Sequence, residues 1–359
     1  MMRLRLNNLN KRIPSLSIFS SSFSLFSSST SSGSDNIKEE LDTDIGKYYA
    51  IATTDTAFKH MLSPSIGNNS ILISFLNSFV PDFYHDKIQE AKEISNSIPV
   101  LKTTKRKQKI MDLHVVSENG LHYIIEMQAR RHSMFDERGL FYACSTYSQQ
   151  LSEKDFKSRK CYLDLKPTIA LHILDYDTNL VRGTNEPIDQ RFLNEVQEFP
   201  MKEDQFIKHF ILTDALSGQK IKDLQIIQVE LPRAVKLKTM FPPSKSFTLV
   251  DWWISILYYS NQYTPELVNS YKSGELIIPD VICKALERLD LKKWNPREVS
   301  EYKNDLADMS IYQTNMAAER AEGKAEGKLE VVKRMKSKGM TTQIIAEVTG
   351  LSEETINST

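Results

Sequence analysis

The chain has 359 residues, of which 40% are hydrophobic and 26% are charged, and its 46 basic side chains balance 46 acidic ones. This composition is ordinary for a globular protein, and the length allows one large domain or two. It excludes nucleic-acid binding through overall charge, so any affinity for a polyanion must come from a local basic patch or a bound metal.

The first 42 residues form a serine-rich leader. Residues 1–34 contain four basic side chains and no acidic one, which leaves 42 basic and 46 acidic residues in the rest of the chain. The leader lacks the clean apolar segment of a secretory signal, and its composition is typical of an organelle transit peptide. Two interpretations stay open. The leader is either a transit peptide for mitochondria or another organelle, or a disordered tail without a targeting role. In the second case the protein would be found in the cytoplasm or nucleus.

The central part of the chain, residues 43–308, reads as an α/β domain. A helical pattern begins with Thr54 or Asp55 as its N-cap and is interrupted at Pro64 and Gly67. The other expected elements, in chain order, are a strand at 88–94, a strand hairpin at 111–130, a helix at 136–152, a strand at 167–176, a strand at 224–231 and a helix at 249–260. The near-continuous apolar run at 167–176 predicts a strand that is buried on both faces.

The last 51 residues, 309–359, read as a helical tail. Its alanine-, glutamate- and lysine-rich part with a doubled "AEGK" predicts an exposed helix broken by glycines. The end resembles half of a helix-turn-helix, with Ile344, Ile345 and Val348 on one face, Gly350 at the turn and Ser352 capping the next helix. Such a unit serves either for packing and self-association, giving a homo-oligomer, or for reading DNA.

Cysteine usage and hydropathy bear on where the protein works. The three cysteines are widely spaced and form neither a disulfide framework nor a zinc pattern, which fits a reducing compartment. The longest strongly apolar stretch, residues 252–259, is far too short to span a bilayer. We therefore expect a soluble intracellular protein that does not insert into a membrane.

The hairpin at 111–130 carries two acids, Asp112 and Glu126, in strands rich in β-branched and aromatic residues. A two-residue turn at Asn119 and Gly120 would send the two carboxylates to opposite faces of the sheet. A three-residue loop that ends in Gly120 would instead place Asp112 opposite Glu126, about 5 Å apart at Cβ. Only this register gives a uniformly apolar second face, made of Met111, Leu113, Val115, Tyr123, Ile125 and Met127, so the sequence predicts the three-residue loop.

Two opposed carboxylates on a half-buried face need a counter-charge. One interpretation is structural, either a salt-bridge network with Lys109, Arg130 or Arg131 or simple exposure to solvent. The other is a divalent-metal site with oxygen ligands from Asp112, Glu126 and the backbone carbonyl of Met127, which suits Mg²⁺ or Mn²⁺. The spacing of the acids does not decide between them.

The motifs "TDTAFKHMLS", "ILISFLNSFV", "KIMDLHV", "YIIEMQAR", "RGLFYACSTYSQQL" and "PTIALHIL", in this order and spacing, resemble the PD-(D/E)XK nuclease superfamily. Within it, they resemble the recombination-promoting nuclease, or transposase, family, from about Asp55 to the C-terminus. The resemblance implies a restriction-endonuclease-like αβββαβ core with a mixed sheet, and metal-dependent cleavage of double-stranded DNA.

The resemblance also implies roles for individual residues. Asp112 and Glu126 would hold Mg²⁺ or Mn²⁺, and Gln128 stands where the superfamily more often has lysine. Glutamine can hydrogen-bond water or phosphate but brings no charge. Asp55 matches an early acid of the family, either as an outer-shell metal contact or as a plain helix N-cap, and Lys59 follows it by one turn.

The helix expected at 136–152 has two faces, which the spacing of its residues predicts. We expect a core stripe made of Leu140, Cys144, Tyr147 and Leu151. A second face carries Arg138, Tyr142, Ser145 and Gln149, and if it flanks the metal, Arg138 and Gln149 would contact DNA phosphate or sugar. Lys59 and the basic stretch with Lys105, Arg106 and Lys107 are further candidates for DNA contacts, or else solvated surface charges.

Two functions follow from these patterns. The first is a Mg²⁺-dependent DNA endonuclease of the recombination or mobile-element type, with Asp112, Glu126 and Gln128 as its catalytic residues. The second is a DNA-binding or assembly protein that keeps the nuclease fold with weakened chemistry. The two acids favour the enzyme, and Gln128 favours the alternative.

Overall fold

The computed structural model describes ten stretches of the chain, residues 49–64, 69–80, 87–94, 97–98, 109–110, 112–130, 135–151, 161–178, 204–274 and 276–359. They all belong to one structural unit, Gly46–Thr359. The leader at 1–42 and the basic triplet Lys105, Arg106 and Lys107 lie outside the described residues.

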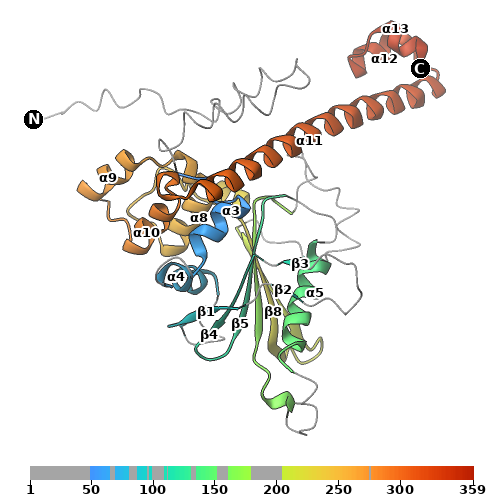
Figure 1. The fold of residues 1–359 in the computed structure, drawn as a ribbon. Coiled ribbons are helices and arrows are strands. Elements are labelled where there is room, and N and C mark those ends of the chain that lie inside the picture. Colours follow the sequence, from blue (N-terminus) through green and yellow to red (C-terminus); the bar gives the residue numbers. More distant parts are fainter. Residues whose placement is uncertain are drawn as a thin grey trace, which may run out of the picture. The chain divides into compact units, whose positions relative to one another are not determined.

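A six-stranded mixed sheet forms the centre of the fold (Figure 1). In spatial order its strands are β1 (Ala91–Glu93), β4 (Leu113–Ser117), β5 (His122–Gln128), β6 (Thr168–Leu174), β8 (Lys220–Glu230) and β7 (Ile207–Thr213). Strands β5, β6 and β8 run parallel, and the flanking pairs are antiparallel. Two short strands, β2 (Ser97–Ile98) and β3 (Lys109–Ile110), pair separately. This mixed sheet with its helices confirms the α/β architecture predicted for a PD-(D/E)XK core.

The helices occupy most of the rest of the described chain. They are α3 (Asp55–Leu62), α4 (Ser70–Phe79), α5 (Phe135–Ser148), α7 (Leu231–Leu237), α8 (Leu249–Tyr259), α9 (Pro265–Ser273), α10 (Asp280–Arg288), α11 (Pro296–Ser337), α12 (Thr342–Thr349) and α13 (Glu353–Ser358). Short 3₁₀ turns lie at Cys161–Leu163, Ser260–Gln262 and Leu291–Lys293. None of the described helices is long and apolar enough to cross a membrane.

The β4–β5 hairpin has the predicted register. Its ladder pairs Leu113 with Ile125 and Val115 with Tyr123, and these four side chains are buried. The turn is the three-residue loop that ends in Gly120, whose φ of 80° lies in the left-handed region that glycine adopts without strain. The Ser117 N–H donates to the Leu121 carbonyl over 3.0 Å, which closes the loop.

Strand β6 lies in the middle of the sheet, and all seven of its residues are buried. It pairs in parallel with β5 on one side and with β8 on the other. This confirms the prediction of a strand buried on both faces. Its register also places His172 beside Glu126 of β5 and beside Gln228 of β8, so that a polar row crosses the otherwise apolar sheet.

Helix α5 contacts the sheet through a different face from the predicted one. The buried positions are Phe135, Gly139, Tyr142, Ala143 and Thr146, and the expected core residues Leu140 and Cys144 are exposed. Tyr142 and Ala143 pack on Ile124 and Ala170 of the sheet. The prediction of the buried stripe was wrong because the small residues Gly139 and Ala143 let the helix approach the strands closely. The periodicity of hydrophobic side chains does not reveal such a contact.

Helix α11 continues through both glycines that were expected to break it. It begins with Asn295 as N-cap, where the Asn295 side chain accepts N–H groups of Arg297 and Glu298, and runs for 42 residues. A glycine inside a helix costs only about 1 kcal/mol relative to alanine. The surrounding alanine, glutamate and lysine residues are good helix formers, so Gly323 and Gly327 are tolerated.

Alanine in place of Gly323 or Gly327 is therefore expected to stabilise this part of α11. A Cβ at either position meets no atom within 4 Å, so the change adds helix propensity without a clash. We expect the free energy of local opening near residue 325 to rise by about 1 kcal/mol for each substitution. Amide hydrogen exchange of α11 checks this expectation, and exchange that is unchanged or faster would contradict it.

The C-terminal helices close a small cluster of their own. Val332 of α11, Ile345 of α12 and Ile356 of α13 are buried together. The prediction of Gly350 at the turn is confirmed by its φ of 65°, and Ser352 caps α13 by accepting the Thr355 N–H. The predicted apolar face of α12 is correct for Ile345 alone: Ile344 and Val348 are exposed because one turn of α11 covers only one side of so short a helix.

Candidate active site

Asp112 and Glu126 meet at the open end of the β4–β5 hairpin. Asp112 directly precedes β4, one step beyond the ladder pair of Leu113 with Ile125, and so lies beside Glu126 and Met127 of β5. Its Oδ2 accepts the Met127 N–H over 2.8 Å. The predicted register therefore brings both carboxylates and the Met127 backbone to one place.

The surroundings of Asp112 and Glu126 disfavour the charged forms of both carboxyl groups. Glu126 is only 6% exposed, and burial raises the pKa of its carboxyl group to about 7, with a further increase from Asp112 and opposing effects of Arg138 and Lys59. Burial likewise raises the pKa of Asp112 to about 6, although Lys59 and the Met127 N–H favour its charged form. An additional cation at this position would therefore stabilise both carboxylates.

The raised pKa of Glu126 predicts a pH dependence of stability in the absence of metal. Because the folded pKa of about 7 exceeds the ordinary 4.5, the folded state holds a proton that the unfolded state has lost between these values. The contribution of Glu126 to stability should thus fall as the pH rises from 4.5 to 7, and Glu126→Gln should remove this contribution. Urea unfolding in EDTA between pH 4.5 and 8 measures the difference between the two proteins.

Glu118→Gln is the control that should show no effect in this pH range. The Glu118 carboxylate accepts the N–H groups of Gln89 and Glu90, and these bonds lower its pKa. Its contribution to stability is fully present above the ordinary pKa of 4.5 and is lost only at lower pH, so the substitution should not alter how stability changes between pH 4.5 and 8. A wild-type stability that does not decline relative to Glu126→Gln between pH 4.5 and 7 would contradict the buried, charge-poor site.

Helix α3 supplies the observed counter-charge. The Lys59 Nζ lies 3.3 Å from Asp112 Oδ1 and 2.8 Å from Asp55 Oδ1. The N-cap of α3 is Thr54, whose hydroxyl accepts the Ala57 N–H, so of the two caps considered for this helix Asp55 is not the one used. Asp55 is instead the first helical residue and holds Lys59 in place.

Gln128 is engaged at both ends of its side chain. Its Nε2 donates to the Arg130 carbonyl over 2.8 Å, and its Oε1 accepts from Arg138 Nη2 over 3.0 Å. Arg130, one of the salt-bridge partners considered for the acids, instead lies over the Tyr312 ring of α11 at 4.8 Å. Arg131 lies outside the described residues, as does the Lys109 side chain.

Beneath α5, beside Glu126, lies a buried histidine that the sequence analysis did not single out. His172 is 1% exposed, packs on the Phe135 ring at 4.9 Å, and has no hydrogen-bond partner for either ring nitrogen among the described residues. Burial, and next to it Arg138, lower its pKa to about 4, so the ring is neutral. The one sequence signal that could have found it is a histidine inside an apolar, doubly buried strand.

The predicted DNA-contacting residues are only partly brought together. Lys59 and Arg138 both lie close enough to affect the pKa of Glu126. Gln149 is exposed in the turn after α5, about 11 residues beyond Arg138, which corresponds to roughly 16 Å along the helix. The structure therefore separates Gln149 from the carboxylates, and its contact with DNA stays a prediction.

The donor set fits a small divalent cation. Within the described stretches, no group of three or more His, Cys, Asp or Glu side chains is arranged to hold a metal ion. Mg²⁺ needs no such group, because it is held by one or two carboxylates and completes its shell with water and phosphate oxygens. Asp112, Glu126 and the Met127 carbonyl offer that hard-oxygen set, and a bound cation would favour the charged forms of both acids, whose pKa values burial raises.

Comparison with known proteins agrees with this geometry. Residues 52–319 match the family model described as "PD-(D/E)XK nuclease family transposase". No curated protein matches the chain. No solved structure matches it. Since the family match covers well over half of the sequence and includes the sheet, α3, α5 and both carboxylates, the chain belongs to the PD-(D/E)XK nuclease family of transposases.

Proposed function

We propose that the protein is a Mg²⁺- or Mn²⁺-dependent DNA endonuclease of the recombination-promoting, transposase-like type. The observation that carries the proposal is the pairing of two carboxylates, the half-buried Asp112 and the buried Glu126, beside the Met127 backbone at the end of one hairpin. Sheet interiors rarely hold two such acids without a function, because burying like charges together is unfavourable.

The residues of the chain would act as follows. Asp112, Glu126 and the Met127 carbonyl would hold the ion, which polarises a phosphoryl oxygen and makes an attacking water more acidic. In the hydrolysis, the water oxygen forms a bond to phosphorus and the bond from phosphorus to the sugar oxygen breaks. The water loses a proton and the leaving oxygen gains one. Asp55 would steady the site from outside by holding Lys59.

Binding of double-stranded DNA would rest on basic side chains around the acids. Arg138 and Lys59 lie next to the carboxylates, and the predicted triplet Lys105, Arg106 and Lys107 would add phosphate contacts. Such contacts release counterions, so the affinity should fall steeply with salt. Self-association through α11, whose outer surface is mostly exposed, is the corresponding proposal for the C-terminal helix.

A second function is favoured by one observation, the engagement of Gln128. Both ends of this side chain are bonded within the protein, so it is not available to orient a water or a phosphate without losing those bonds. A DNA-binding or assembly protein with weakened chemistry would be consistent with this arrangement.

Incubation with supercoiled plasmid separates the two functions. The enzyme should nick or linearise the plasmid with Mg²⁺ or Mn²⁺ and be inactive in EDTA. Gel-shift titration of the same plasmid, run in Ca²⁺, reports binding without cleavage. Binding with no cleavage in either Mg²⁺ or Mn²⁺ would refute the enzyme and leave the binding protein in its place.

For the leader we propose an organelle address, on composition alone. Residues 1–42 fused to a fluorescent reporter should direct it to mitochondria or another organelle. A reporter spread through the cytosol would instead support a tail without a targeting role.

A further inference from the structure

Phosphodiester cleavage places extra negative charge on the phosphate in its transition state, and a fixed positive side chain near the acids would stabilise it. Two described cations, Arg138 and Lys59, act on Glu126. Gln128 on the same strand brings no charge. The two cations differ in how readily their side chains can turn toward a phosphate.

Arg138 is held in place by the fold. Its Nη2 donates to Gln128 Oε1, its guanidinium carbon lies 5.6 Å from the centre of the Phe135 ring, and its Nε is buried. Turning the guanidinium group toward solvent would break its hydrogen bond to Gln128 and its contact with the Phe135 ring. Arg138 thus fixes Gln128 and the strand that carries Glu126, and this half-buried side chain would contact DNA only from that fixed position.

Lys59 differs in both exposure and attachment. Its side chain is 34% exposed, and its Nζ is shared between Asp55 and Asp112. The pair with Asp55 is largely exposed and therefore weak. In the pair with Asp112 the Asp112 side chain is only 16% exposed, so Nζ would leave that carboxylate only when another cation takes its place. Lysine also carries a flexible four-carbon stem, so Nζ can leave Asp112 while it keeps its contact with Asp55.

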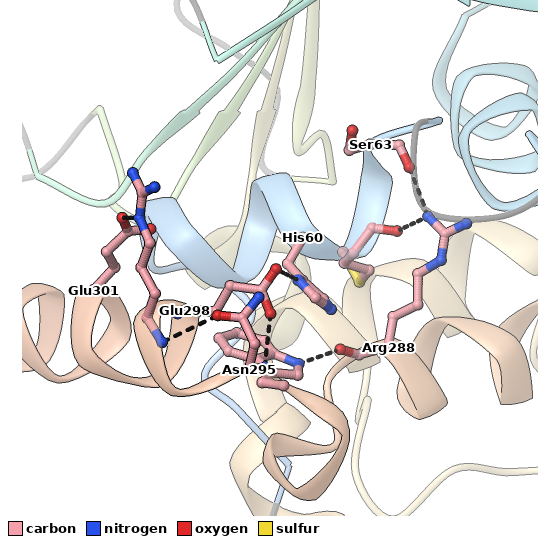
Figure 2. A network of polar contacts seen from close by, with 9 residues as sticks. His60, Ser63, Arg288, Asn295, Glu298 and Glu301 are labelled. Atoms are coloured by element: carbon pink, nitrogen blue, oxygen red, sulfur yellow. Dashed lines mark hydrogen bonds and ion pairs between the residues drawn. The ribbon is translucent and has the colours of Figure 1, made fainter.

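The backbone of α3 is anchored, so this motion is confined to the side chain. Figure 2 shows Arg288 of α10 directed at the end of α3, where its Nη1 donates to the Ser63 and Met61 carbonyls over 2.9 and 3.0 Å. His60 lies 3.5 Å from Glu298 of α11 in the same view. At the other end of α3, Asp305 of α11 accepts the Thr56 N–H over 2.8 Å.

We propose that Lys59 is the catalytic cation of this site, a role that rests on the nuclease function proposed above. Nζ pairs with Asp112, one of the residues that would hold the ion, so the two cations would compete for this carboxylate. When a divalent ion takes the carboxylates, Nζ turns to the scissile phosphate and stabilises the charge that develops on its oxygens. Lys59 forms no covalent bond and transfers no proton in this role.

The test combines two readouts that should move in opposite directions. Lys59→Met should lower the rate of plasmid nicking in Mg²⁺ by roughly 100-fold or more, the usual effect of losing one transition-state donor. The same variant should bind Mn²⁺ several-fold more tightly in calorimetry at pH 8, because the ion no longer competes with Nζ for Asp112. A residue that merely holds the fold together would weaken both.

Two further variants sharpen the result. Lys284→Met is the matched control, because Lys284 forms the same i,i+4 pair with Asp280 on α10 and should leave both readouts unchanged. Gln128→Lys added to Lys59→Met should restore part of the nicking, since position 128 is two residues from Glu126 on the same strand face.

The outcomes separate this inference from the proposed function. Wild type and Lys59→Met that nick equally would overturn the role of Lys59 and leave the nuclease standing. Reduced nicking with unchanged or weaker Mn²⁺ binding and no rescue by Gln128→Lys would make Lys59 a structural residue. A wild type that never nicks with Mg²⁺ or Mn²⁺ would overturn the nuclease, and this inference with it.

Discussion

Asp112→Asn is expected to abolish plasmid nicking while most of the DNA affinity is retained. The change keeps the size of the side chain but removes the charge that holds the cation, whose contribution of several kcal/mol corresponds to a rate loss of roughly 100-fold or more. DNA affinity relies on basic side chains such as Arg138, so gel-shift titrations at fixed salt should change little. Nicking assays on the same preparations provide the comparison.

Glu126→Gln should behave alike, and the double variant should be no worse than either single one, because both acids serve the same ion. Asp280→Asn is the control, since Asp280 is an exposed acid of α10 that pairs with Lys284. Equal nicking by wild type and Asp112→Asn would remove Asp112 from the reaction.

Gly139→Ala is expected to be the most destabilising small substitution near the site. A Cβ at this position would lie 2.4 Å from Cε1 of His172, a ring that is 1% exposed and enclosed between the sheet and α5. Since the ring has no room to withdraw, α5 must shift, and such overpacking typically costs about 1–3 kcal/mol. Denaturant unfolding should show a loss of that order, although alanine is the better helix former.

Gly323→Ala provides the matched control for Gly139→Ala, because it places the same methyl group in a helix where nothing lies within 4 Å. The two substitutions should have opposite signs. If Gly139→Ala were as neutral or stabilising as Gly323→Ala, the tight packing of α5 on His172 would be wrong. Nicking should also fall in Gly139→Ala, because its neighbour Arg138 fixes Gln128.

The hairpin was predictable because its information is local. The loop that ends in Gly120 and the alternation of apolar residues fix the register of β4 and β5 without reference to the rest of the chain. Strand β6 was predictable for a similar reason, since a continuous apolar run has few other places in an α/β fold.

The errors concern contacts between distant segments. The buried face of α5 was missed because its contact depends on Gly139 meeting His172 from a strand more than 30 residues later, and glycine carries no hydrophobic signal. The sequence also did not identify Lys59 as a counter-charge of Asp112, because Lys59 reaches it from α3, more than 50 residues earlier in the chain. The sequence predicted that two glycines break helix α11, but α11 continues through both of them. Each glycine lowers helix propensity by only about 1 kcal/mol, and the flanking helix-forming residues outweigh this cost.

The central claim is that Asp112 and Glu126 together hold one divalent ion, and counting bound Mn²⁺ tests it without relying on activity. Calorimetric titration at pH 8 should find one Mn²⁺ per chain in the wild type. Binding at this site should be lost in Asp112→Asn and in Glu126→Gln, and Asp280→Asn should match the wild type. No Mn²⁺ binding by the wild type, or equal binding by all four proteins, would contradict the claim.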